Sequence, residues 1–329
     1  KSPEKLAENI WFHSIYVPKT GWMRTSYQGC IRAVRRRLKV IVPDLVHGQG
    51  TERECAVSAV FSRFPNVLTI HGNMAELARL FKAPMGSFGW LAAQLEQITL
   101  KRTRGVFCNS EYTENLVKPR ALKTWRVPNA IREAFCDTPK TPAPAGKCVL
   151  LNIGLVSERK RQVELLDVAR RLHERGLEFE LQFIGQIAEG DYGVTFAGRL
   201  KEAEAKGYAC HLGLKTTAEL IACCDAAHGL LHFPSEEAFG LVVAEGMARD
   251  LKFFGARIGG IIDISSGVPG AELFGADDWE GLAAGIARWI QQGHPKSPET
   301  SQVMNARYHP RVVAQRHLEI YREVLSKDS

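Results

Sequence analysis

Short apolar runs alternate with longer helical patterns along the whole 329-residue chain, and this alternation is the feature that most constrains the fold. The helical pattern is clear in residues 162–175, where Val163, Leu166 and Ala169 repeat at three-residue steps. Runs rich in β-branched residues separated by such helices are typical of parallel α/β layers, whereas a β-sandwich or a helical bundle would lack the alternation. The sequence therefore predicts an α/β fold.

The expected strands form two groups, which predict two Rossmann-like parallel-sheet domains. In the first half of the chain they are residues 10–17, 40–46, 66–70, 105–108 and 124–127. In the second half they are residues 148–154, 178–185, 208–212, 229–233, 253–256 and 270–273. The stretch between the groups, residues 138–147, is rich in proline and has no periodicity, which predicts an interdomain linker. A last helix, over about residues 310–325, follows the second group.

Charge is divided unevenly between the two halves. Residues 1–147 hold 23 Lys/Arg against 11 Asp/Glu, whereas residues 148–329 hold 20 against 25. A basic half favours an anionic partner, which composition leaves open as nucleic acid, phospholipid or a phosphorylated substrate. The densest basic run surrounds Ile31, Val34 and Leu38, whose spacing predicts an amphipathic helix with a solvated basic face; its cations are Arg32, Arg35, Arg36, Arg37 and Lys39.

Cysteine usage and hydropathy indicate the compartment. The eight cysteines include no C-x-x-C pair and no metal-ligand spacing, which favours a reducing, cytosolic setting. The chain as given has no apolar run near 18 residues and no signal-peptide pattern at its start. We therefore expect a cytoplasmic protein whose membrane contact, if any, is peripheral and at the inner face.

The strongest local feature is a junction between a strand and a helix within residues 233–248. A polar turn follows the strand, and an apolar helix begins near Phe239. The backbone N–H groups of Phe239, Gly240 and Leu241 and the positive end of the helix dipole favour an anion there, and Gly240 permits close approach.

Two carboxylates flank this junction. Glu237 precedes the helix, and Glu245 lies more than one turn inside it. Carboxylates do not bind phosphate, but they can accept hydrogen bonds from sugar hydroxyls on either side of a diphosphate. The structural alternative is that Glu237 only complements the helix dipole and Glu245 is solvated.

A second candidate anion site runs from a strand through Gly154 and a loop into a helix. Arg159, Lys160 and Arg161 stand where that helix opens, and cations there oppose the helix dipole unless an anion or solvent screens them. The alternative is a set of ordinary surface cations. The chain has no D-x-D sequence for holding a divalent ion on a diphosphate, so we expect no metal, with two helix N-termini and Lys160 providing the neutralisation.

Two further features stand in the first half. Gly48, Gln49 and Gly50 are similar to the start of a dinucleotide fingerprint but lack its third glycine and its acidic residue. His71 follows the strand at residues 66–70, where open α/β sheets place ligand groups. Position alone leaves a structural role for His71 open.

Taken in order, these motifs resemble the retaining family-4 glycosyltransferases of the two-domain GT-B architecture. The hallmark is Glu237 and Glu245 with Phe239, Gly240 and Leu241 between them. Four weaker matches accompany it: Thr69-Ile70-His71-Gly72, Cys108-Asn109-Ser110-Glu111, Val127-Pro128-Asn129-Ala130 and Gly154 to Lys160. Residues 308–325 are similar to the family's closing helix, which returns to the first domain.

The resemblance implies an enzyme that moves a sugar from a nucleotide-diphosphate sugar to an acceptor with retention of anomeric configuration, without a metal or further cofactor. Glu245 would bind the ribose hydroxyls, Glu237 the donor sugar, and Lys160 the diphosphate as charge develops on it. His71 would approach the reacting sugar from the first domain. Backbone contacts to sugar and phosphate would come from Phe239, Gly240 and Leu241.

The resemblance also implies a domain division: an acceptor-side domain over residues 1–137, a linker over 138–147, a donor domain over 148–306 and a closing helix over 307–329. Leu155 stands where the family commonly has arginine after Gly154, which makes Arg159 the candidate replacement. The first domain is expected to lack its N-terminal strand and glycine-rich loop, since no such pattern precedes Ile10.

The acceptor is not readable from the sequence. An anionic or lipid-linked acceptor suits the basic first domain, and cell-envelope polysaccharide is the expected product class, with no nucleic-acid partner. The alternative function is a non-catalytic protein that binds a nucleotide sugar or a polyanion.

Overall fold

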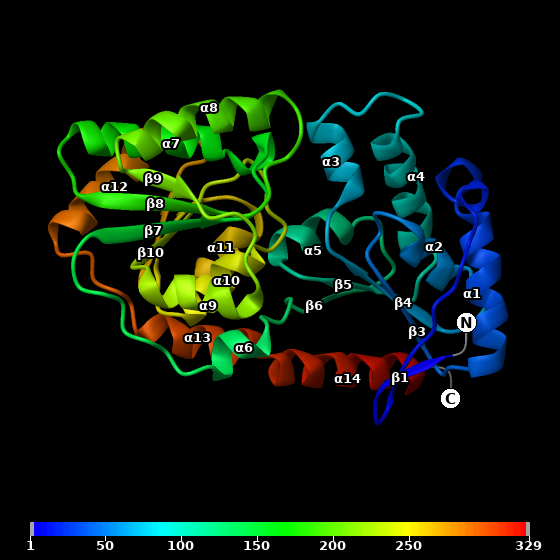
Figure 1. Cartoon of the computed structure of the whole chain (residues 1–329). Coiled ribbons are helices and arrows are strands. Elements are labelled where there is room, and N and C mark those ends of the chain that lie inside the picture. The colour runs from blue at the N-terminus through cyan, green and yellow to red at the C-terminus, as the bar shows by residue number, and fades with distance from the viewer. Residues whose placement is uncertain (1–2, 327–329) are drawn as a thin grey trace. The chain divides into compact units, whose positions relative to one another are not determined.

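The computed structural model describes residues 3–326 and divides into two compact units (Figure 1). The first unit comprises the chain as far as Val127 together with the residues from Arg316 on, and the second runs from Pro128 to Gln315. The division falls ten residues before the predicted linker. Residues 138–147 belong to the second unit, where the Arg249 guanidinium donates to the carbonyl oxygens of Thr138 and Pro139.

The first unit is built on four parallel strands in the order β3-β4-β5-β6. Their bounds are Val46–Gln49, Asn66–Ile70, Val106–Cys108 and Thr124–Arg126. The helices of this unit are α1 (Gln28–Ile41), α2 (Glu54–Val60), α3 (Met74–Leu80), α4 (Phe88–Leu100), α5 (Glu111–Val117) and the end of α14 (Pro310–Ser326). Before them come the antiparallel pair β1 (Glu4–Ala7) and β2 (Ile10–Phe12) and two short 3₁₀ turns.

The two faces of this sheet are covered by different parts of the chain. Alternate residues of a strand point to opposite faces, so Val106 and Cys108 pack with residues of α2, α4 and α5. Phe107 points the other way, where its ring lies 5.0 Å from the ring of His317 on α14. The end of α14 therefore covers one face of a sheet whose strands lie within residues 46–126.

The second unit is built on six parallel strands in the order β12-β11-β10-β7-β8-β9. In chain order, β7 to β12 span Cys148–Ile153, Phe179–Ile184, Ala209–His211, Gly229–His232, Lys252–Ala256 and Ala271–Phe274. The helices α7 (Gln162–Glu174), α8 (Asp191–Ala205) and α12 (Trp279–Gln291) share one core cluster. The other cluster holds α6 (Glu133–Asp137), α9 (Thr217–Ala226), α10 (Leu241–Ala248), α11 (Gly259–Ser265) and α13 (Glu299–Tyr308). The predicted α/β class with two parallel sheets is confirmed.

Two predicted strands are wrong. Residues 10–17 form a strand only at Ile10–Phe12, which pairs with β1 outside the parallel sheet. Residues 40–46 are divided between the end of α1 and the start of β3, because α1 continues through Ile41. The predicted absence of an N-terminal strand and glycine-rich loop from the first domain stays a prediction.

The helices described for residues 3–326 include none that combines the length and the apolar character needed to cross a bilayer.

Candidate active site

Two loops of the second unit meet at the carboxyl edge of its sheet, because β7 and β10 are neighbouring parallel strands. The first loop leaves β7 through Gly154, whose φ of 150° favours glycine, and reaches a 3₁₀ turn over Glu158–Lys160 before α7 begins. The second loop leaves β10 after His232 and reaches α10 through Gly240. Carboxyl ends of parallel strands are where open α/β sheets bind ligands, so this edge is the candidate site.

The centre of the site is a cluster of three ionisable side chains. Lys160 Nζ donates to the carboxylate of Glu237, and His232 Nε2 donates to the same Oε2 atom at 2.9 Å. Lys160 Nζ also lies 3.4 Å from His232 Nε2. The side chains of Lys160 and Glu237 are 14% and 13% exposed, so solvent screens their attraction weakly. The predicted candidates Lys160 and Glu237 are thus brought together.

Burial and neighbouring charge set the protonation states of this cluster. Burial alone would raise the pKa of the Glu237 carboxyl, but the hydrogen bond from His232 and the charge and hydrogen bond of Lys160 outweigh it and hold the pKa far below its usual value. Burial and the Lys160 charge lower the pKa of His232, against the opposing pull of Glu237. Glu237 is therefore a carboxylate at neutral pH and His232 a neutral hydrogen-bond donor.

Arg159 connects the two loops. Its NH1 atom lies 3.1 Å from the carbonyl oxygen of Glu236 and 3.3 Å from a Glu236 carboxylate oxygen. The backbone N–H of Ser235 donates in return to the carbonyl of Arg159 at 2.9 Å. Burial raises the pKa of Glu236, and the Arg159 charge opposes that rise. Arg159 thus holds the second loop against the first, and its guanidinium is turned to Glu236.

The N-terminus of α10 supplies backbone donors next to this cluster. Gly240 is the N-cap with φ of 94°, a left-handed conformation, and no side chain caps the helix. The N–H groups of Val243 and Ala244 donate to the Gly240 carbonyl, whereas those of Leu241 and Val242 precede the first bonds of the helix and are available to an anion. Phe239 is 3% exposed and anchors the turn in the core.

Glu245 lies inside α10 and is 2% exposed. Arg132 holds it through two parallel bonds, from Nε to Oε1 at 2.7 Å and from NH2 to Oε2 at 2.8 Å. The remaining Arg132 nitrogen, NH1, donates to Thr217 Oγ1 at 3.0 Å. A carboxylate has about four acceptor positions, so this pairing leaves Glu245 room for two more hydrogen bonds.

His71 belongs to the first unit, where it follows the carboxyl end of β4. Its ring is exposed, and Nε2 lies 3.2 Å from Gln49 Oε1. The next backbone N–H, that of Gly72, donates to Glu52 Oε1 at 2.8 Å. The structure places His71 directly after the carboxyl end of β4, beside Gln49 at the end of β3, and its role toward a ligand stays a prediction.

Sequence reasoning missed His232 and Arg132. His232 closes β10, and the signal was its place at the last residue of a buried strand ahead of the acidic turn. Arg132 follows the Val127-Pro128-Asn129-Ala130 motif by two residues. Its partner Glu245 is 113 residues away, a pairing that no local spacing could show.

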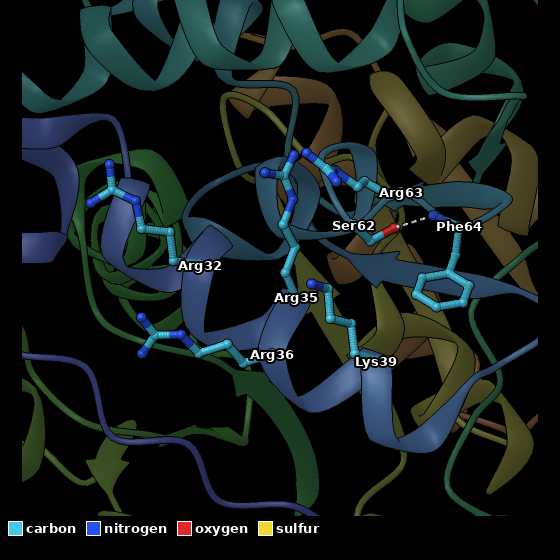
Figure 2. Close-up of a pocket in the computed structure, with 7 residues that line it drawn as sticks. All are labelled: Arg32, Arg35, Arg36, Lys39, Ser62, Arg63 and Phe64. Atoms are coloured by element: carbon cyan, nitrogen blue, oxygen red, sulfur yellow. Dashed lines mark hydrogen bonds between the residues drawn. The ribbon is translucent and has the colours of Figure 1, made fainter.

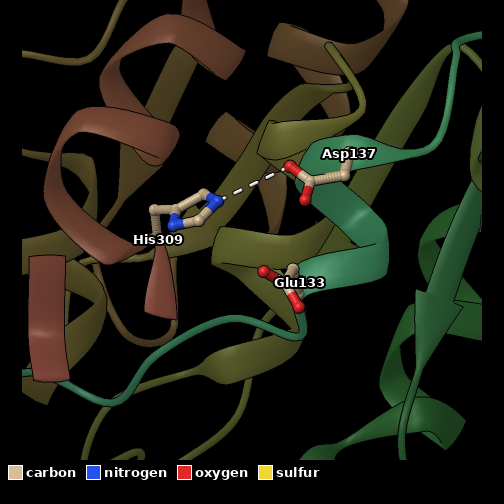
Figure 3. Close-up of side chains that lie close together, drawn as sticks. All are labelled: Glu133, Asp137 and His309. Carbon is tan, nitrogen blue, oxygen red and sulfur yellow. Dashed lines mark ion pairs between the residues drawn. The ribbon is translucent and has the colours of Figure 1, made fainter. Parts of the chain in front are cut away.

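One cluster elsewhere in the second unit has the composition of a metal site (Figure 3). Glu133 and Asp137 on α6 and His309 at the end of α13 offer ligand atoms within 4.8 Å of one another. His309 Nδ1 accepts the backbone N–H of Arg311 at 3.2 Å, so the neutral ring carries its proton on Nε2, which lies 3.5 Å from Asp137. A metal-binding histidine instead donates from its second nitrogen, so this geometry fits the contact between His309 and Asp137 better than a metal site.

Comparisons with known proteins agree with this architecture. The family model of glycosyl transferases group 1 matches residues 137–307, and that of glycosyltransferase family 4 matches residues 1–134. Sucrose-phosphate synthase from Thermosynechococcus elongatus superposes with a TM-score of 0.82 at 15% identity, covering 99% of this chain and 86% of that one. No curated protein matches the chain significantly by sequence.

Two ligand complexes are also similar in fold. Anabaena HepE with UDP-glucose has a TM-score of 0.72 at 17% identity and covers 91% of this chain and 82% of its own. The pneumococcal O-GlcNAc transferase GtfA with UDP and GlcNAc has a TM-score of 0.68 at 15% identity and covers 90% and 60%. The two parallel-sheet units therefore define a GT-B glycosyltransferase fold. The chain belongs to the glycosyl transferases group 1, as the motifs predicted.

Proposed function

We propose that the protein transfers a sugar from a nucleotide-diphosphate sugar to an acceptor, with retention of anomeric configuration and without a metal. The observation that carries the proposal is the cluster of the partly buried Lys160 and Glu237 with the buried His232, beside the N-terminus of α10. A cation, a carboxylate and uncapped backbone donors at one sheet edge match the three parts of such a donor: diphosphate, sugar hydroxyls and the oxygens between them.

Lys160 is the group suited to the leaving diphosphate. Its ammonium is paired with Glu237 in the ligand-free protein, and an arriving diphosphate offers a second anion on its other side. Negative charge grows on the diphosphate as the glycosidic bond breaks, so a buried cation stabilises the transition state more than the ground state. Glu237 keeps two or more acceptor positions for hydroxyls of the transferred sugar.

Glu245 is suited to the ribose. Arg132 fixes its carboxylate and uses two acceptor positions, which leaves one for each of two adjacent hydroxyls. Because Glu245 is 2% exposed, a ribose reaches it only when a neighbouring side chain moves. Structural relatives bound to UDP make a UDP-sugar the first donor to test.

The acceptor would meet the first unit, where His71 stands at the end of β4. The excess of cations in this part of the chain favours an anionic or lipid-linked acceptor and peripheral contact with a membrane. In this proposal, the domain that binds the acceptor ends at residue 137, and the domain that binds the donor begins at residue 148.

The test is a donor screen followed by product analysis. UDP-, GDP- and ADP-sugars are compared by thermal shift, and hydrolysis or transfer of the stabilising donor is followed by NMR, which reports the anomeric configuration. We expect Glu237→Gln to lower turnover at least a hundredfold, and EDTA to leave it unchanged. Nucleotide binding with no turnover would favour the non-catalytic binder, and an inverted product would refute retention.

A further inference from the structure

A second concentration of charge lies in the first unit, in a pocket of about 410 Å³ (Figure 2). One wall is a face of α1 with Arg32, Arg35, Arg36 and Lys39, in which residues 32 and 35 and residues 36 and 39 are three apart, and residues 32 and 36 and residues 35 and 39 are four apart. The opposite wall is the segment between α2 and β4. It contributes Ser62, Arg63 and Phe64. The predicted basic helix is confirmed, but its charged face forms one side of a cavity.

The five cations of this pocket are not neutralised by the protein. In the described chain, residues 3–326, no ion pair with a carboxylate within 4.0 Å involves any of the five. Among their side chains, within the same described residues, only that of Arg35 makes a hydrogen bond, from Nε to the carbonyl oxygen of Phe61. Other exposed cations of the same unit do pair: Arg79 with Glu76, and Arg126 with Glu111 and Glu114. The five pocket cations thus lack the carboxylate partners that Arg79 and Arg126 have.

The cations of this pocket repel one another when no ligand is bound. Like charges three or four residues apart on a helix repel, and α1 carries four such pairs on the face that lines the pocket. Arg63 adds a fifth charge from a backbone with φ of 76°, a conformation that residues other than glycine adopt infrequently. Figure 2 shows the guanidinium ends of Arg35 and Arg63 directed toward the same part of the pocket. A multiply charged anion would offset this repulsion.

The pocket is distinct from the candidate active site. Ser62 to Phe64 lead into the amino end of β4, whereas His71 follows its carboxyl end. Five residues of β-strand span roughly 16 Å, so one small anion cannot contact both. Lys160 and Glu237 belong to the other unit. An anion held here is thus additional to the diphosphate of the donor.

We propose that this pocket is a binding site for a ligand that carries two or more phosphate charges. Arginine matches phosphate oxygens through pairs of parallel N–H donors, and four arginines with one lysine suit a diphosphate or two neighbouring phosphates. The ligand is either a soluble phosphorylated compound or the headgroup of an anionic lipid. Val40, Ile41 and Val42, which come directly after the pocket's Lys39, are 76%, 42% and 67% exposed and would contact the lipid in the second case.

The test compares two variants of α1, one that removes two cations of the pocket and one that removes a single cation outside it. Arg32→Gln/Arg36→Gln removes two pocket cations that have no recorded hydrogen bond, and Arg37→Gln removes a cation of the same helix that does not line the pocket. Inorganic pyrophosphate is titrated into each protein by calorimetry in the presence of saturating UDP, and each protein is sedimented with vesicles of phosphatidylcholine with or without phosphatidylglycerol. UDP itself is titrated separately into both variants and into Lys160→Gln.

We expect the double variant to bind pyrophosphate or anionic vesicles at least tenfold more weakly than wild type, since each charge-assisted contact contributes about a factor of ten. Arg37→Gln should stay within about threefold, an effect of surface charge alone. Loss with pyrophosphate indicates a soluble ligand, and loss with vesicles only indicates a lipid. The proposal is overturned if the double variant matches wild type with both probes, or if Arg37→Gln loses as much.

The proposal for the pocket and the proposal for the donor site can be refuted independently of each other. If the pocket proposal is correct and the donor proposal is wrong, the double variant loses pyrophosphate or vesicles while no variant changes the response to UDP. In the opposite case, Lys160→Gln loses UDP and the pocket variants behave as wild type.

Discussion

Replacement of Lys160 by glutamine tests the central cluster of the candidate site. The substitution keeps a hydrogen-bond donor but removes the charge that neutralises Glu237, and both side chains are less than 15% exposed. Breaking a buried ion pair by removing one partner costs about 3–5 kcal/mol. We take about 3 kcal/mol here, because His232 still donates to the carboxylate. For a unit of this size that value lowers the unfolding midpoint by roughly 6–12 °C.

Differential scanning calorimetry at pH 7 measures this change directly. Glu237→Gln and the double variant complete a thermodynamic cycle, in which we expect a coupling of about 2 kcal/mol, because the double variant has no unpaired buried charge. Arg161→Gln is the control, since its ion pair with the 77% exposed Asp277 contributes at most about 1 kcal/mol.

The same samples test binding. UDP should raise the midpoint of wild type and Arg161→Gln but leave that of Lys160→Gln unchanged. A Lys160→Gln midpoint within about 2 °C of wild type would refute the energetic reasoning. A normal response to UDP in that variant would refute the role of Lys160 in binding the diphosphate.

Three other predictions concern single contacts. Arg132→Gln removes the guanidinium that holds the buried Glu245, so we expect the second unit to lose about 2–3 kcal/mol in urea unfolding; a loss under about 0.5 kcal/mol would contradict this. Gly240→Ala places a side chain at φ of 94° and should cost about 1–2 kcal/mol and weaken UDP binding; the control Gly198→Ala, on the exposed face of α8, should stabilise by about 0.5–1 kcal/mol and leave UDP binding unchanged. Burial, with the charges of His317 and His71, lowers the pKa of His47 from 6.5 to about 4. The unfolded chain therefore takes up this proton first, and about 3 kcal/mol of stability, present above pH 6.5, is lost as the pH falls toward 4; His47→Gln should show a flatter pH profile.

The parts of the fold that could be predicted from the sequence are those whose local pattern and tertiary role agree. The strand at residues 66–70 is buried throughout, and the apolar residues in this run predict it. Residues 40–42 are β-branched and suggest a strand, yet α1 extends through Ile41, and all three side chains are exposed. The true strand β3 was missed because its sequence includes Gly48. A Cβ there would lie 2.8 Å from Leu68 and 2.9 Å from Ala59, so the close packing of α2 requires glycine at this position. Glycine has a low β-propensity, and for that reason the sequence does not indicate a strand here.

The candidate site divides in the same way. The helix N-terminus at Gly240 and the cations before α7 follow from local sequence, because glycine, charge and strand endings are visible in a short window. The pairing of Lys160 with Glu237 joins residues 77 positions apart, and it depends on β7 and β10 being neighbours in the sheet. Strand order is a property of the whole unit. Arg159, the candidate phosphate ligand, contacts Glu236, also 77 positions away, and its role toward a phosphate stays a prediction.

Because α14 begins in the second unit and ends in the first, the order of synthesis affects the order in which the two units fold. The ring of Phe107 packs against His317, and the Trp125 indole donates to Glu323 at 3.1 Å. During synthesis, residues 128–315 emerge before this helical segment does, so the second unit can fold while one face of the first sheet is still bare. The unit whose sheet is translated first is thus completed last. The face of its sheet that carries Phe107 and Trp125 stays exposed until residues 316–326 have left the ribosome.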